Sequence, residues 1–229
     1  MTSRYPISRS GARGQRGNEI IEFGLWAIFI VPLFLWMFVN AMNLVRMNEA
    51  TQVCRDIGNL YIHGQDFSQY PAQQLARRLA NGYGLQIGSN FAPNSNATND
   101  GNTGNGWVVL SQVTYVGASS CASLPVGTAC TNQDKYVYLQ RIDFGNKNLK
   151  FNGTAVKSAI GTPTATMNSS GIVAAYMTDP GAVAPNFANF VTTPLADGQV
   201  MFVAETFFAS PDLNFAALPA GGIYNRIFL

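Results

Sequence analysis

The chain has 229 residues, a length that suits one domain with an appendage. Only 11% of its residues are charged, against roughly a quarter in an ordinary soluble domain, and this excludes an intrinsically disordered chain and a coiled coil. The net charge of +2 excludes a strongly basic nucleic-acid binder, and three cysteines with one histidine leave little material for a zinc site. We expect no metal, no cofactor and no nucleic-acid partner.

The net charge lies at the N-terminal end of the chain. Four arginines give the first seventeen residues a charge of +4: Arg4, Arg9, Arg13 and Arg16. Glu19 and Glu22 follow, whereas residues 46–229 contain ten basic and ten acidic residues. The sequence therefore predicts a basic leader over residues 1–17.

An uncharged segment follows this leader. Residues 23–45 are twenty-three residues without a charged side chain. About twenty apolar residues suffice to cross a bilayer as a helix, so we predict a transmembrane helix over residues 18–45. A cleavable secretory signal is the alternative, but its apolar core would be only about 7–15 residues long. Pro32 lies inside the run and predicts a kinked or locally melted helix near residues 28–32.

The arginines also predict an orientation. Basic residues that flank a membrane helix stay in the cytoplasm. We therefore expect a single-pass protein of a bacterial inner membrane, with a cytoplasmic N-terminus and with residues 46–229 outside the cytoplasmic membrane.

Glu22 is a carboxylate at the edge of the apolar segment, where charge is costly. One interpretation places it among the lipid headgroups at little cost. The other requires a partner cation, which cleavage after Gly17 would supply as the new amino group of Asn18. Glu22 would then be the fifth residue of the mature chain, one helical turn from that amine.

This junction resembles a type IV prepilin processing site, and the first part of the chain resembles the TadE-like family of pilin-like proteins. The matching features are Gly17, four further residues, Glu22-Phe23, a long apolar helix with Pro32, and an arginine stretch that reaches about Gly58. More loosely, residues 199–211 resemble the late aromatic strand of the family, and residues 222–229 resemble its closing segment.

The resemblance implies a function in the tight-adherence (Flp) pilus. A prepilin peptidase would cut between Gly17 and Asn18, and Glu22, Phe23 and Pro32 would serve in assembly. The implied partners are the major Flp pilin, other minor pilins, the inner-membrane assembly platform and the lipid bilayer. The implied fold is pilin-like, and incorporation into the pilus is left open.

The helical pattern continues beyond the membrane segment. An apolar stripe predicts an amphipathic stem that ends at Gly64, and it consists of Met47, Ala50, Cys54, Ile57 and Tyr61. From Asn18 to His63 this helix would be about 70 Å long. Pro71 then predicts the start of a second helix. Its expected apolar stripe is Leu75, Ala76, Leu79, Ala80 and Tyr83, with Gly82 or Gly84 as its end. The stem and second helix together span residues 46–87.

Residues 88–229 are predicted to form a β-rich head. Residues 88–106 are rich in asparagine and glycine and predict a loop, with a calcium site as the alternative. Alternating patterns at 107–116, 135–144 and 199–208 predict strands of an antiparallel sheet with one covered face. Tyr136, Tyr138, Gln140, Ile142 and Phe144 are expected on one face of their strand. Residues 146–170 are expected to be loop, and residues 171–177 a short strand or helical turn. The predicted fold class is α+β, with the helical stem packed on a small sheet.

Cys121 and Cys130 flank the connection between the first two strands. Thiols outside the cytoplasmic membrane are commonly oxidised, so we predict a disulfide between them. Cys54 would remain a buried free thiol, with an intermolecular bridge as the alternative.

The sequence contains no recognisable catalytic constellation. Cys54 and His63 would be about 13 Å apart along a helix, too far for a nucleophile pair. Glu205 is the one plausible buried carboxylate of the head, and a membrane-tethered hydrolase built on it is disfavoured. We therefore expect a protein that is not an enzyme.

The leading hypothesis is a minor pilin or pseudopilin that takes part in pilus assembly and so in adhesion. The alternative is an uncleaved, signal-anchored periplasmic binding or sensor module.

Overall fold

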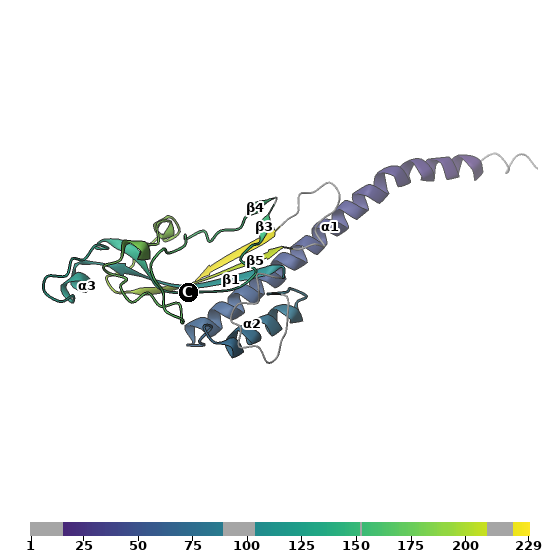
Figure 1. Cartoon of the computed structure of the whole chain (residues 1–229). Coiled ribbons are helices and arrows are strands. Elements are labelled where there is room, and N and C mark those ends of the chain that lie inside the picture. Colours follow the sequence, from purple (N-terminus) through teal and green to yellow (C-terminus); the bar gives the residue numbers. More distant parts are fainter. Residues whose placement is uncertain (1–15, 89–103, 152, 210–221) are drawn as a thin grey trace, which may run out of the picture. The chain divides into compact units, whose positions relative to one another are not determined.

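A computed structural model of the chain describes residues 16–88, 104–151, 153–209 and 222–229, with side chains from residue 20 onward (Figure 1). The chain divides into two compact units, Met1–Val45 and Arg46–Leu229. Helix α1 (Arg16–Ile62) begins in the first unit and ends in the second, which also holds every other helix and strand of the described residues.

The first unit contains the apolar part of α1. Among the described residues, α1 is the one helix long and apolar enough to cross a membrane. Pro32 lies within it, yet the helix is uninterrupted, so the expectation of a locally melted segment at 28–32 is wrong. Proline removes one backbone donor and disfavours straight helix, and Figure 1 shows this part of α1 as a curved ribbon.

The end of α1 belongs to the second unit and packs by helical periodicity. Its buried side chains are Ala50, Val53, Cys54, Ile57 and Tyr61, whereas Met47 of the predicted stripe is half exposed. Gly64, with φ of +84°, follows the helix. Its N–H donates to the carbonyl of Tyr61, and the N–H of Gln65 donates to that of Leu60. This is a Schellman motif, and it ends the stem where the sequence predicts.

Helix α2 (Tyr70–Gly82) begins with Pro71 in its first turn and ends in a second motif of this kind, with Gly84 at φ of +70°. Its buried face agrees with the predicted stripe at Ala76 and Ala80 and differs at the large residues. Ala72, Ala76 and Ala80 face the core, whereas Leu75 and Tyr83 are more than one-third exposed. Small alanines let α2 lie close to the core residues beneath it. The polar residues Gln73, Gln74 and Arg77, and not the leucines, complete the buried face.

The head is built on a four-stranded antiparallel sheet in the order β2-β1-β5-β6. The strands are β1 (Gly106–Val116), β2 (Lys135–Gly145), β5 (Val200–Ala209) and β6 (Gly222–Phe228). The other elements are the hairpin strands β3 (Lys150–Phe151) and β4 (Thr154–Ala155), helix α3 (Ala118–Ala122) and two short 3-10 helices, Pro180–Ala182 and Phe187–Asn189. The α+β class and the small antiparallel sheet are as expected.

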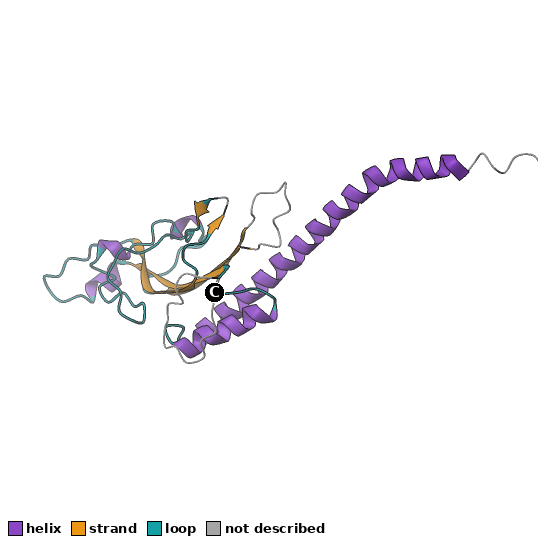
Figure 2. Ribbon diagram, turned by 45° about the vertical axis from the view of Figure 1, so that its right-hand side comes forward, coloured by secondary structure: helices purple, strands orange, loops and turns teal. Residues whose placement is uncertain are grey.

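Both faces of this sheet are covered, contrary to the prediction of one. The end of α1 and helix α2 lie on one face (Figure 2), where they pack against Leu110, Phe144 and Phe208 among others. On the other face, Val109 and Phe207 are also buried, and Leu149 packs on them. The irregular segment from 146 to 199 forms this second cover, and its residues Ile160 and Phe187 are fully buried.

A β-bulge divides the side chains of β2. Gln112 pairs with Gln140 and Val113 pairs with Tyr138, so Leu139 is an extra residue. A bulge shifts the alternation of side chains by one. Gln140 therefore accepts a hydrogen bond from Tyr61 on the helical side, whereas Tyr138 donates to the carbonyl of Gly161 on the other. The prediction that these side chains share one face is wrong for this reason.

Candidate assembly and processing site

The predicted cleavage point lies at the very start of α1. Gly17 and Asn18 belong to the first turn of the helix, whose first residue is Arg16. The leader up to residue 15 lies outside the described residues, as do the side chains of residues 16–19. The structure therefore places the predicted cut at the boundary between leader and helix and describes no side chain there.

Glu22 lies on one face of α1 together with Leu25, Trp26 and Phe29, at the spacing that brings helical side chains together. These four residues line a shallow depression of about 190 Å³. Phe23 is 76% exposed beside it. No described residue forms a hydrogen bond or an ion pair with the side chain of Glu22. The arrangement is a single carboxylate within an apolar helix face, open to a partner that carries a cation.

Pro32 leaves a backbone carbonyl of α1 without its helical donor. Because proline has no N–H, the carbonyl of Ile28 loses its usual helical donor. The nearby side chains of Phe29, Leu33 and Trp36 are more than half exposed. This apolar surface is suited to contact with lipid or with other apolar helices.

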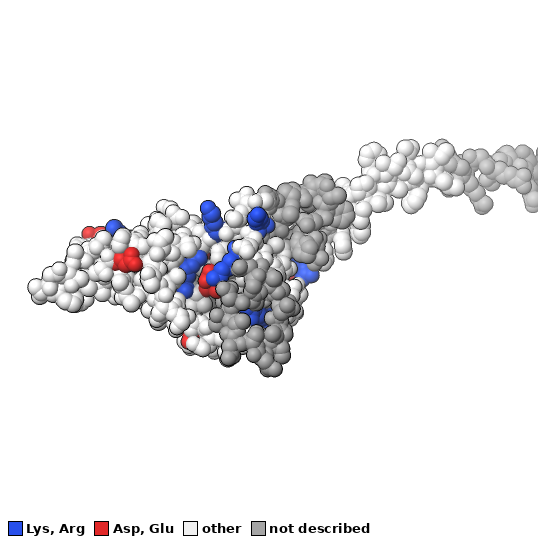
Figure 3. All heavy atoms as spheres, viewed as in Figure 1, with Lys and Arg blue, Asp and Glu red and all other residues white. Residues whose placement is uncertain are grey.

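Charged residues are also few on the second unit. On its visible face, the Lys, Arg, Asp and Glu side chains are scattered (Figure 3).

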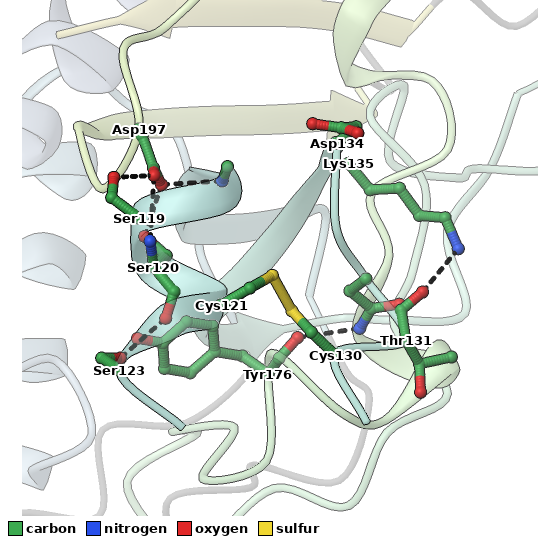
Figure 4. Close-up of a disulfide and its surroundings, with 12 residues drawn as sticks. Ser119, Ser120, Cys121, Ser123, Cys130, Thr131, Asp134, Lys135, Tyr176 and Asp197 are labelled. Carbon is green, nitrogen blue, oxygen red and sulfur yellow. Dashed lines mark hydrogen bonds between the residues drawn. A yellow bond between two sulfur atoms is a disulfide. The ribbon is translucent and has the colours of Figure 1, made fainter. Parts of the chain in front are cut away.

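Cys121 and Cys130 form a disulfide at the end of α3 (Figure 4). Asp197 holds the start of the same helix by accepting hydrogen bonds from the hydroxyls of Ser119 and Ser120 and from the N–H groups of Gly117 (2.7 Å) and Ser120 (2.9 Å). The bonds from Ser119 and Ser120 hold the pKa of Asp197 well below its usual range. Sequence reasoning missed this residue, because its partners are about eighty positions away.

Glu205 is fully buried, as the sequence suggests, on the face of the sheet opposite the helices. It accepts hydrogen bonds from the Ser158 hydroxyl, from the Ala159 N–H (3.0 Å) and from the Tyr224 hydroxyl (2.7 Å). Burial, and then the charge of Glu205, raise the pKa of Tyr224, which keeps this hydroxyl a protonated donor. The network fastens the 146–199 cover to the sheet.

The two candidate nucleophile residues are separated in the structure. Cys54 is buried, and desolvation raises the pKa of its thiol to about 12, so it is not a thiolate at neutral pH. His63 is exposed and its Nδ1 lies 2.7 Å from the carbonyl of Asn59. Among residues 16–88, 104–151, 153–209 and 222–229, no three His, Cys, Asp or Glu side chains form a group that could hold a metal ion. The calcium alternative at 88–106 falls mostly outside these ranges.

Comparison of the chain with models of protein families, with curated proteins and with solved structures returned no match.

Proposed function

We propose that the protein is a minor pilin or pseudopilin of a tight-adherence (Flp) pilus, processed after Gly17 and active in pilus assembly and adhesion. The carrying observation is the junction itself. Gly17 stands five residues before Glu22, and Glu22 lies at the start of the apolar part of α1, where most large side chains between Ile20 and Val45 are exposed. The resemblance to the TadE-like family supports the same proposal.

The proposed mechanism uses the helix twice. A prepilin peptidase of the inner membrane removes the leader, and the apolar helix then stays in the bilayer. On assembly, the helix leaves the lipid and packs against the helices of other pilins. Glu22 neutralises the amino group of an Asn18, in its own chain or in a neighbour, because an unpaired charge buried among apolar helices costs several kcal/mol. The head then projects outward.

Two substitutions test the two steps separately. Gly17→Ala adds a side chain next to the scissile bond, and we expect uncut protein that is seventeen residues longer. Glu22→Ala removes the partner of an amine that exists only after the cut, so we expect normal trimming and membrane retention but loss of co-assembly with other pilins. The measurements are the mass of the envelope protein and its recovery in sheared pili.

Glu22→Asp is the matched control, since it keeps the carboxylate and should restore part of the assembly. Normal pili from both Gly17→Ala and Glu22→Ala would contradict the proposal. An uncleaved, signal-anchored binding module would then be the better account, and a cavity in the head favours that second candidate.

A further inference from the structure

The edge of the sheet at β2 is only partly covered. Segments of the 146–199 cover pair with its first half, where Val137 bridges Val183 and Gln140 bridges Ile172. The N–H of Arg141 donates to the carbonyl of Gly171, and the N–H of Val173 donates to that of Leu139. At Gly171, which has φ of +72°, the covering chain turns away. The second half of the edge begins there.

The main-chain groups of Asp143 point out of this edge. In an antiparallel pair, alternate residues direct both their N–H and their C=O toward the partner strand. Arg141 bonds outward to Gly171, and the N–H of Asn146 bonds inward to Gly106 of β1. Alternation from both ends therefore places Asp143 in the outward set, and no described backbone group outside the sheet bonds to it.

A cavity of about 280 Å³ lies against this stretch of edge. It is lined from the helical side by Gln73 and Ser68, from the strand by Asp143, and from the cover by Met167 and Ser169. Gln73 is 98% buried, since its relative exposure is 2%, and its Nε2 donates to the carbonyl of Phe67. Its Oε1 accepts no hydrogen bond from any described residue. Because this oxygen is itself buried, the polar groups that the cavity offers to a ligand are those of the strand edge beside Asp143.

We propose that this cavity binds a short extended peptide segment of another protein, whose main chain adds to the β2 edge beside Asp143. Strand addition of this kind takes its affinity from main-chain hydrogen bonds. The edge already accepts an extended segment, because residues 171–173 pair with it antiparallel. The peptide continues along the line that this segment leaves at Gly171 and bonds to the N–H and C=O of Asp143.

The ligand is defined by its main chain, not by a charge. The Oδ1 of Asp143 lies 3.0 Å from the Nζ of Lys147, so these two charges are already paired. The guanidinium of Arg141, the other charged residue of the lining, donates to the carbonyl of Gly161. The cavity volume limits the insert to a few residues, which excludes a folded strand at the edge of an intact sheet. The inference does not depend on the proposed pilin function.

The test uses the full chain in detergent and a library of short, end-capped peptides as the probe. Binders are selected, and their affinity is measured by fluorescence polarisation. Each binder is then resynthesised with single N-methyl groups at successive amides. Strand addition predicts that methylation weakens binding about tenfold at alternate positions and little between them, because every second N–H faces the edge.

The protein is changed in a matched pair, Asp143→Pro and Asp143→Ala. Both remove the carboxylate, but only proline removes the outward N–H, and proline is tolerated at an edge position whose N–H the sheet does not use. We expect the proline variant to bind at least about tenfold more weakly than the alanine variant. If the proline variant fails to fold, the methylation series decides alone. The proposal is overturned if no peptide binds saturably, if methylation has no alternating effect, or if the two folded variants bind equally.

Discussion

The carboxylates of Glu205 and Glu22 lie in contrasting surroundings. Glu205 is completely buried and accepts three hydrogen bonds from Ser158, Ala159 and Tyr224. Buried polar groups are tolerated when they are satisfied in this way. Glu22 is exposed on an apolar helix and has no described partner. Under the proposed function, its partner is the amino group of Asn18 in the processed chain or in a neighbouring chain.

Asp197 makes a pH-dependent contribution to the stability of the head. Hydrogen bonds from Ser119 and Ser120 lower its pKa in the folded protein relative to the unfolded chain. A group with a depressed folded pKa stabilises the fold above its unfolded pKa of about 4, and the stabilisation is lost as the pH falls below that value. We expect Asp197→Ala to lower the melting temperature at neutral pH, and the difference from the wild type to shrink below about pH 4.

Thermal unfolding of both proteins over a series of pH values checks this expectation. Asp134→Asn is the control, because Asp134 is exposed and has φ of +59°, a conformation that asparagine adopts readily and alanine does not. The melting temperature of this variant should follow the wild type across the series. A constant difference between Asp197→Ala and the wild type down to strongly acid pH would contradict the interpretation.

At the scale of elements, the Cys121–Cys130 disulfide stabilises α3 and the connection to β2. Closing a short loop stabilises the folded state by about 2–3 kcal/mol relative to the unfolded chain. We expect Cys121→Ser with Cys130→Ser to lose about this amount of unfolding free energy. Non-reducing peptide mapping of envelope protein should show the two cysteines linked and Cys54 free. A free Cys121 thiol in that protein would remove the prediction.

The docking of α1 on the sheet depends on Gly58. A Cβ at this position would lie 2.7 Å from Cδ1 of Leu229 and 3.3 Å from Cβ of Ala204. Gly58→Val should therefore overpack the interface and cost about 1–3 kcal/mol of unfolding free energy. Gly82→Val in α2 is the matched control, since a Cβ there meets no described atom within 4 Å. Its effect should stay within about 0.5 kcal/mol, and equal losses in both variants would refute the packing argument.

The elements with strong periodicity could be predicted, whereas their contacts across the fold could not. The stem, its end at Gly64 and three strands follow from spacing and turn residues. The bulge at Leu139 depends on how β1 and β2 pair, and one strand alone contains no signal for it. The buried face of α2 includes the predicted Ala76 and Ala80, but it also includes Gln73, Gln74 and Arg77, whose burial apolar periodicity does not reveal. The cover over Glu205 is irregular chain, and only its tertiary contacts reveal it.

At the scale of the whole molecule, the chain combines an apolar helix that exposes its side chains with a head that has its own core. The net positive charge is confined to the leader, and the chain from Arg46 onward carries equal numbers of basic and acidic residues. Removal of the leader would delete four arginines from the chain and leave Glu19 and Glu22 at the new N-terminal end. The proposed processing therefore reverses the charge beside the membrane helix and prepares it to accept an amine.

The central claim is that the leader is removed, and the N-terminal residue of the native protein tests it most directly. Mass spectrometry of the protein purified from its own cell envelope, before and after digestion, identifies that residue. The account predicts a chain that begins at Asn18 and lacks the seventeen residues of the leader. A native chain that still contains Arg4 to Gly17 would contradict it.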